Sequence, residues 1–159
     1  MSASLVRLMR VAVVLAGLGI VLAAYLTWVH FNTGSLVCGL GDCHTVQASE
    51  YATIGPVPVA VLGLGMYAVV FLANVAALGQ PARAMPLAVV AFGVLLAGTL
   101  YAAYLTWLEV AVIHAICQWC VASALLSLTL LVIQSRVVWD VLASSEPDRD
   151  ETPNRLPAS

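Results

Sequence analysis

The stretch Val11–Val29, VAVVLAGLGIVLAAYLTWV, contains no charged side chain. A helix needs about 20 mostly apolar residues to cross the hydrocarbon core of a membrane, and this run has that length. Similar runs follow at about 57–78, 86–108 and 115–134. A membrane offers no partners for backbone N–H and C=O groups, so segments that cross it form helices. The sequence therefore predicts an all-α membrane protein, a bundle of four transmembrane helices within residues 11–135.

The composition excludes the main classes of soluble protein. Of the 159 residues, 62% are hydrophobic and 9% are charged, whereas a soluble domain has roughly 45–50% apolar and about 25% charged residues. Lys and Arg together number only 6, so we expect no nucleic-acid partner. Four spanning helices occupy most of the chain, which leaves no room for a separate soluble catalytic domain.

The arginines indicate the orientation of the helices. They stand before the first run, between the second and third, and after the fourth: Arg7, Arg10, Arg83, Arg136, Arg149 and Arg155. Positive residues remain on the cytoplasmic side. We therefore predict a multi-pass protein of the inner or plasma membrane with a cytoplasmic N-terminus (1–10) and a disordered cytoplasmic tail (136–159). The loop 31–55 then caps the outward mouth of the bundle, and the cysteines lie on the outer side.

The hexapeptide Ala-Ala-Tyr-Leu-Thr-Trp occurs twice, at Ala23–Trp28 and Ala102–Trp107. Each copy is followed at the same interval by a cysteine, Cys38 in one case and Cys117 in the other. The repeat is consistent with two helix pairs related by duplication, and equally with interface aromatic residues in a biased composition. In both cases each half of the chain brings a cysteine pair to the same surface.

Those cysteines form two close pairs, Cys38-Gly-Leu-Gly-Asp-Cys43 in the outer loop and Cys117-Gln-Trp-Cys120 at the start of the fourth helix. Residues three apart share a helix face, and the unpaired N–H groups of a first turn favour a thiolate. Cys-x-x-Cys thiols in redox proteins have pKa values of roughly 3.5–7.5. The thiolate is the form that attacks a disulfide. A flexible pair beside a helix-bound pair is typical of a two-step electron relay.

Two other interpretations of the cysteines remain open. Outward-facing cysteines often form static disulfides, although a Cys-x-x-Cys bridge closes only a tiny loop and removes little chain entropy. The four sulfurs, with His44 or His114, could instead bind Zn²⁺ tetrahedrally. Either reading makes the chain a non-catalytic membrane protein. We favour redox activity and expect no metal.

The cysteine pairs and the residues between them resemble the vitamin K epoxide reductase family, specifically its bacterial disulfide-forming branch. The order of the motif separates it from the DsbB oxidases, in which the Cys-x-x-Cys follows the first helix. The resemblance covers about residues 11–134 and is carried by Cys38, Cys43, Ser49, Gly55-Pro56-Val57-Pro58, Leu62-Gly63 and Cys117-Gln-Trp-Cys120.

The resemblance implies a quinone-linked disulfide oxidoreductase. Cys117 and Cys120 would be the active-site pair, with Cys120 facing the quinone, ubiquinone or menaquinone. Cys117 would exchange with Cys43, and Cys38 would form the mixed disulfide with a partner. That partner would be a separate DsbA-like protein of the thioredoxin fold outside the cytoplasm, and its electrons would pass to the quinone pool of the bilayer.

The resemblance also assigns a role to Ser49, which matches a residue that hydrogen-bonds the quinone oxygen. Tyr51 is a further candidate for the wall of the pocket. Vertebrate relatives carry an Asn in the second helix and a Tyr one turn after the active-site pair, where this chain has Val59 and Ala124. Neither side chain can form a hydrogen bond. This departure favours quinone reduction over the alternative within the family, the reduction of vitamin K epoxide.

The remaining polar residues near the cysteines receive no firm role. We expect Asp42, Glu50 and Glu109 in the outer loops, with Glu50 a candidate for proton handling. We expect Trp119 to contact lipid or another helix.

Overall fold

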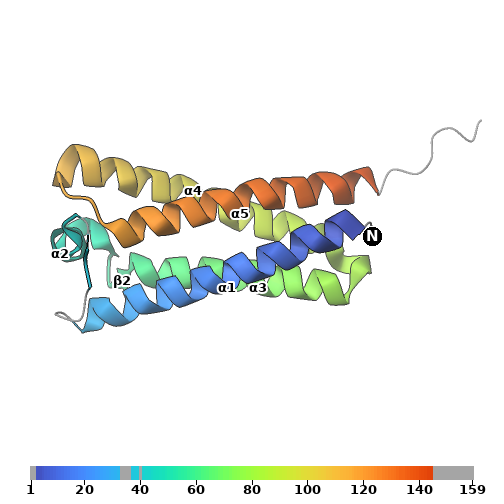
Figure 1. The fold of residues 1–159 in the computed structure, drawn as a ribbon, viewed down its shortest axis with the longest axis horizontal. Coiled ribbons are helices and arrows are strands. Elements are labelled where there is room, and N and C mark those ends of the chain that lie inside the picture. Colours follow the sequence, from blue (N-terminus) through green and yellow to red (C-terminus); the bar gives the residue numbers. More distant parts are fainter. Residues whose placement is uncertain (1–2, 33–36, 40, 145–159) are drawn as a thin grey trace, which may run out of the picture.

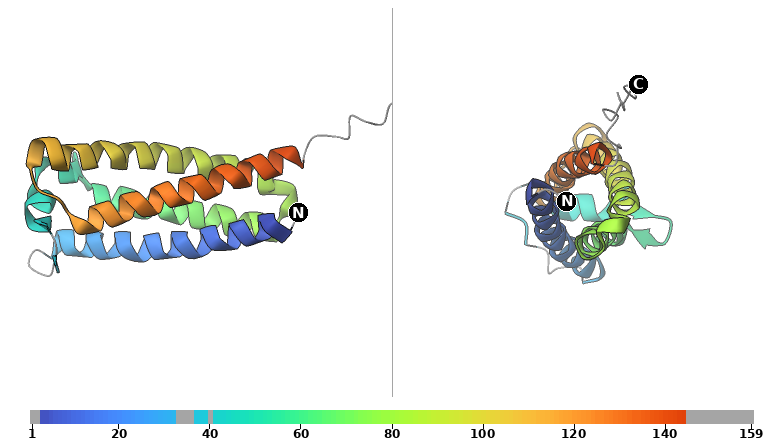
Figure 2. Two further views of the ribbon diagram at one scale, coloured as in Figure 1. Left: turned by 45° about the horizontal axis from the view of Figure 1, so that its top comes forward. Right: turned by 90° about the vertical axis from the view of Figure 1, so that its right-hand side faces the viewer.

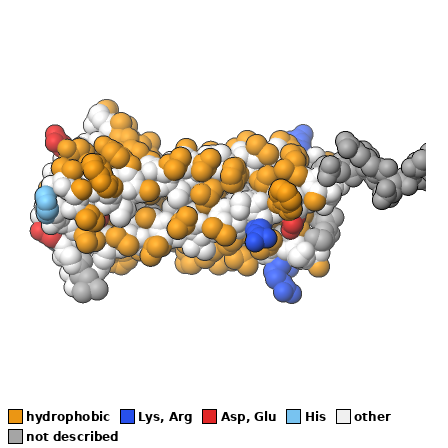
Figure 3. All heavy atoms as spheres, turned by 90° about the horizontal axis from the view of Figure 1, so that it is seen from above, with side chains coloured by type: hydrophobic (Ala, Val, Ile, Leu, Met, Phe, Trp, Pro, Cys, Tyr) orange, Lys and Arg blue, Asp and Glu red, His pale blue; other side chains and the backbone are white. Residues whose placement is uncertain are grey.

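The structure, a computed structural model, describes residues 3–32, 37–39 and 41–144. Within these residues four long helices form a bundle: α1 (Ala3–Phe31), α3 (Val59–Gly79), α4 (Ala84–Leu108) and α5 (Gln118–Ala143) (Figure 1). Each is long and apolar enough to span a membrane, α4 together with its flanking turns over Pro81–Ile113. Hydrophobic side chains cover the side of the bundle and charged ones lie near its two ends (Figure 3). The predicted four-helix membrane bundle is confirmed.

The helices form a ring in which α1 and α4 each pack against both α3 and α5 (Figure 2). Residues 3 and 143 lie at one end, which we call the terminal end. The short turn η2 (Pro81–Arg83) joins α3 to α4 there. The opposite end, which we call the cysteine end, holds residues 37–39, 41–58 and 109–120.

The segment that precedes α3 contains four short elements at the cysteine end. These are α2 (Cys43–Ala48), η1 (Glu50–Ala52), and the antiparallel strands β1 (Thr53–Ile54) and β2 (Val57–Pro58). Asp42 caps α2, because its carboxylate accepts hydrogen bonds from the N–H of Thr45 at 3.1 Å and from its hydroxyl at 2.6 Å. These bonds lower the pKa of Asp42 below its usual value. Much of the predicted outer loop is therefore folded across the mouth of the bundle.

Two predicted boundaries are wrong at the terminal end. The first helix begins at Ala3 instead of near residue 11, because Leu5 and Met9 are buried in the core there. The last helix continues to Ala143 instead of 134, because Val137 and Val141 are buried in the same cluster. Residues 3–10 and 136–143 are thus helical. Residues 145–159 of the predicted tail lie outside the described residues.

Small and polar residues hold the helices together in the middle of the bundle. A Cβ atom at Gly19 would overlap the ring of Tyr67, so glycine lets α1 approach α3 closely. The Tyr67 hydroxyl donates a 2.9 Å hydrogen bond to the carbonyl of Ser123 on α5. Nearer the terminal end, buried Asn74 donates to Gln134 Oε1 at 3.2 Å, which links α3 to α5.

Candidate active site

The two cysteine pairs lie beside each other at the cysteine end. Cys38 and Cys43 form a disulfide, and the loop between them pairs with the strand-like segment before α5. Gly41 forms a β-bridge with Cys117, and the Asp42 N–H donates to the Ile116 carbonyl at 3.1 Å. Gly41 has φ +83°, and a Cβ there would overlap the Ile116 carbonyl, so this contact requires glycine.

Cys43 and Cys117 are both fully buried in one apolar cluster, together with Val29 and Val46. Cys38 and Cys120 pack against the same cluster. Segments more than 70 residues apart in the sequence (Cys43 and Cys117) therefore place their sulfurs in a common environment. This is the arrangement that exchange between two disulfide pairs requires.

The second pair is in the dithiol form. Cys117 has extended backbone angles as the residue before α5, and Cys120 lies in the first turn of that helix. A hydrogen bond from the Cys120 thiol, supported by the backbone N–H groups of Cys120 and Trp119, lowers the pKa of Cys117 from 9.0 to about 7. At neutral pH a substantial fraction of Cys117 is thus in the reactive thiolate form.

Glu109 differs from the prediction that it lies in an outer loop. It is only 3% exposed, and its Oε2 accepts a 3.0 Å hydrogen bond from the N–H of Cys117. It begins a π-helical turn, η3 (Glu109–Ile113), that extends α4 and ends at His114, a residue with φ 55°. The helical continuation keeps Glu109 on the inner face of α4, whereas a loop would have left it in water.

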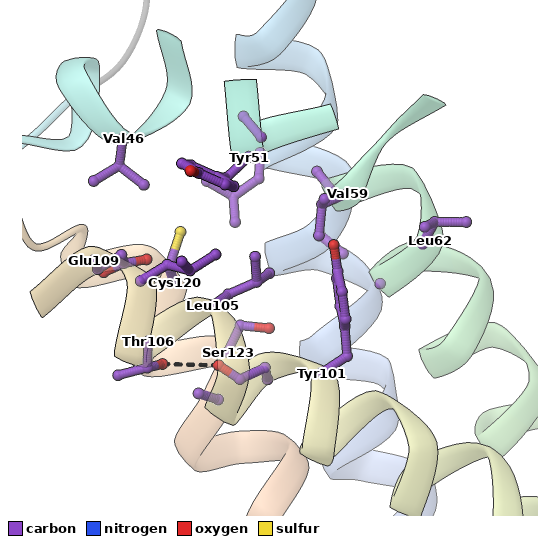
Figure 4. Close-up of a pocket in the computed structure, with 18 of the residues that line it drawn as sticks. Val46, Tyr51, Val59, Leu62, Tyr101, Leu105, Thr106, Glu109, Cys120 and Ser123 are labelled. Carbon is purple, nitrogen blue, oxygen red and sulfur yellow. Dashed lines mark hydrogen bonds between the residues drawn. The ribbon is translucent and has the colours of Figure 1, made fainter. Parts of the chain in front are cut away.

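A cavity of about 190 Å³ lies next to the second pair, between the four long helices and beneath α2 and η1. A single buried water needs only ~15 Å³, so the cavity is large enough for an organic ligand. Its walls are mostly apolar, with a few hydroxyl groups and the sulfur of Cys120. In Figure 4 that sulfur is directed toward Val46 and Tyr51, and Glu109 lies beside it.

The sequence model of the Vitamin K epoxide reductase family matches residues 10–135. The chain belongs to this family. No individual curated protein matches it. Family membership makes the protein a membrane thiol oxidoreductase with a cysteine pair, from a family that uses quinone-type substrates and works with redox partners.

The structure places both non-cysteine candidates, Ser49 from the family resemblance and Tyr51 as a further candidate, at the cavity. Ser49 and Tyr51 both line it, from the junction of α2 and η1 and from η1 itself. The Ser49 hydroxyl donates to the Val46 carbonyl at 2.7 Å, so it also closes the end of α2. Val59 and Ala124 line the same cavity.

Several cavity residues were not predicted from the sequence. Tyr101 and Leu105 of α4 and Glu109 of η3 follow one another at intervals of four and face the cavity together. On α5, Ser123 and Ser127 extend the face of Cys120 and Ala124, two residues already singled out from the sequence. Helical periodicity from Cys120 would have found the α5 residues. No comparable starting point existed on α4, because nothing in the sequence says which of its faces is directed inward.

The two copies of the repeated hexapeptide occupy similar environments in this family member. Thr27 donates to Ala23 O at 2.7 Å, and Thr106 donates to Ala102 O at 2.9 Å. The two tryptophans are 54% and 57% exposed on the side of the bundle. Each copy also supplies residues to the cavity wall, namely Ala23 and Leu26, and Ala102, Leu105 and Thr106. These similarities agree with a duplicated helix pair.

Trp119 contacts another helix, as predicted. Its ring packs edge-on against Tyr25 of α1 with centroids 5.4 Å apart, and its Nε1 donates to the Val37 carbonyl at 2.8 Å. The contact ties the start of α5 to the chain just before Cys38. Within the described part of the chain, His, Cys, Asp and Glu side chains do not gather in groups of three that could hold a metal ion.

Proposed function

We propose that the protein is a quinone-dependent disulfide oxidase of the disulfide-forming branch of its family. The observation that carries the proposal is the spatial order of the four cysteines and the cavity at the cysteine end. A half-buried Cys38 leads through its disulfide to Cys43, then to buried Cys117, and then to Cys120 at a cavity. Each neighbour can exchange with the next by thiol–disulfide chemistry.

The proposed reaction begins at the Cys38–Cys43 disulfide. A thiolate of the reduced partner attacks Cys38 and releases Cys43 as a thiolate, and the second thiol of the partner then resolves the mixed disulfide. Cys43 next attacks Cys117 in the Cys117–Cys120 disulfide, and Cys38 attacks Cys43 to release Cys117. The products are a Cys38–Cys43 disulfide and a Cys117/Cys120 dithiol, the state seen here. The low pKa of Cys117 makes it a good leaving group.

The cavity supports a quinone as the final electron acceptor. A quinone takes up two electrons and two protons as it becomes a quinol. The apolar walls suit its ring, and Ser49, Tyr51 and Tyr101 bring hydroxyl groups that suit its oxygens. The dithiol supplies the electrons when Cys117 and Cys120 join again, and Cys120 is the member of the pair that lines the cavity. Ubiquinone and menaquinone share this chemistry.

The apolar side chains of Val59 and Ala124 favour quinone reduction over reduction of vitamin K epoxide. Both line the cavity where vertebrate relatives would present an amide and a phenol. Without those donors, the side chains at these two positions cannot form hydrogen bonds to an epoxide oxygen.

The proposed membrane orientation puts the termini in the cytoplasm. Arg7, Arg10, Arg83 and Arg136 all belong to the terminal half of the bundle, and positive residues remain on the cytoplasmic side. The cysteine end then faces outward, where a separate DsbA-like, thioredoxin-fold protein can reach Cys38.

Two variants test the proposal. Cys120→Ala should abolish quinone reduction by the reduced protein while leaving the Cys38–Cys43 disulfide intact. Cys43→Ala should accumulate a mixed disulfide between Cys38 and a thioredoxin-fold protein in cells. If the cysteines instead form static disulfides or a zinc site, neither result is expected. Changing the quinone supply should then leave the redox state of all four cysteines unchanged. Unchanged quinone turnover in Cys120→Ala would refute the role of that residue.

A further inference from the structure

The one acidic side chain buried at the cysteine end is Glu109, within the described residues. It lies in an apolar span, and it lines the same cavity as Cys120. An ionisable side chain inside a membrane is expensive to keep, and such residues usually mark proton or ion pathways. The π-helical turn that carries Glu109 is also a feature found often at functional sites.

Glu109 lies beside both members of the active-site dithiol. Its Oε2 accepts the N–H of Cys117 at 3.0 Å, and its carboxyl group lies next to the Cys120 side chain on the cavity wall (Figure 4). Cys117 and Cys120 are thus its titratable neighbours on the α5 side. The other titratable side chains of the cavity wall are Tyr51 of η1 and Tyr101 of α4.

We propose that Glu109 is a catalytic proton acceptor: it takes the proton of Cys120 as the Cys117–Cys120 disulfide forms and passes it into the cavity. The S–H bond of Cys120 breaks, its electron pair stays on sulfur, and an O–H bond forms on the carboxylate. The two electrons leave the sulfurs for the quinone that the proposed function places in the cavity, so this inference rests on the proposed function. Glu109 passes on one of the two protons of the quinol and returns to the carboxylate, and water supplies the second proton.

The position of Glu109 explains why the redox state of the pair controls this proton. The Cys117 N–H stabilises the carboxylate that accepts the proton. Formation of the disulfide consumes the Cys120 S–H, and the nearest buried group that can hold the released proton is Glu109. Without an acceptor in the cavity, the proton stays on Glu109.

Infrared difference spectroscopy on the full-length, quinone-free protein tests this. The Cys117/Cys120 dithiol is oxidised with a soluble small-molecule disulfide while Cys38–Cys43 stays bridged. We expect a carboxylic-acid C=O band to appear in the disulfide state and to move in D₂O. Glu109→Gln should lose the band, because glutamine keeps an oxygen for the Cys117 N–H but cannot take a proton. Glu50→Gln, a change at an exposed residue of the same end, should keep it.

Activity provides a second readout with a short-chain ubiquinone as the probe. Glu109→Gln should slow quinone reduction by on the order of 10²-fold, while exchange between the two cysteine pairs stays within a few-fold of the unmodified protein. Glu109→Asp should retain part of the rate of quinone reduction. If Glu109→Gln does not fold, a change in the frequency of the carboxylic-acid band in Glu109→Asp assigns that band to residue 109. The absence of an acid band in the unmodified disulfide state, or an unchanged quinone rate in Glu109→Gln, would overturn the proposal. If the unmodified protein reduces no quinone, the proposed function fails, and the infrared result still decides the role of Glu109.

Discussion

Replacing Cys120 tests how the site activates Cys117. The largest cause of the low Cys117 pKa is the hydrogen bond from the Cys120 thiol. Cys120→Ala removes that donor, whereas Cys120→Ser keeps a hydroxyl donor at the same place. We expect the pKa of Cys117 to rise from about 7 toward 9.0 in the alanine variant and to stay near 7 in the serine variant.

The expected effect is large enough to measure. A rise of two pH units corresponds to at most ~2.7 kcal/mol between the two protonation states. At pH 7 the thiolate fraction of Cys117 would fall from about one half to about 1%, roughly fifty-fold. Because the pKa is lowered in the native site, the thiolate forms as the pH rises through 7, and the variant should need a pH near 9 for the same fraction.

Ultraviolet absorbance of the thiolate as a function of pH gives the measurement. With the Cys38–Cys43 disulfide intact, each variant has a single free cysteine, so the titration belongs to Cys117 alone. Equal midpoints near 7 in the alanine and serine variants would refute the reasoning. The backbone N–H groups at the start of α5 would then be sufficient to stabilise the thiolate.

Three further predictions concern the cavity and the core. The Ser49 hydroxyl donates to the Val46 carbonyl here and must turn to reach a quinone oxygen. Ser49→Ala should slow quinone reduction by no more than ~10³-fold, the loss typical of one donor, and steady-state kinetics would show it. Gly19→Ala should destabilise the protein by ~1–3 kcal/mol, because the new methyl group overlaps Tyr67; unfolding in mixed micelles measures this. Asn74→Leu should cost ~1–3 kcal/mol by leaving Gln134 Oε1 buried without its donor, and the double variant with Gln134→Leu should recover part of the loss in the same assay.

The ends of the helices show where sequence patterns become weak predictors. Charged residues favour an aqueous environment, so the arginines at 7, 10 and 136 predict that the membrane spans end beside them. In the structure Leu5, Met9, Val137 and Val141 continue the buried face past these arginines, and the helices continue with them. A long charged side chain can point outward from a helix whose other face stays in the core.

Glu109 shows a similar limit within the site. In the sequence, a glutamate at the end of an apolar run predicts the first residue of a loop. Its actual position depends on the π-helical turn and on the N–H of Cys117 that meets it, and both belong to the packing of α4 against the start of α5.

The sequence alone determined that this chain crosses a membrane four times, because the length and polarity of each span are local properties. It also determined the two cysteine pairs and their spacing. The tertiary structure decided that Gly41 pairs with Cys117, that Glu109 lies beside the dithiol, and that Val59 and Ala124 share a cavity with Cys120. These contacts join residues far apart in the chain, and their formation depends on the shapes of the packed helices, which no local pattern records.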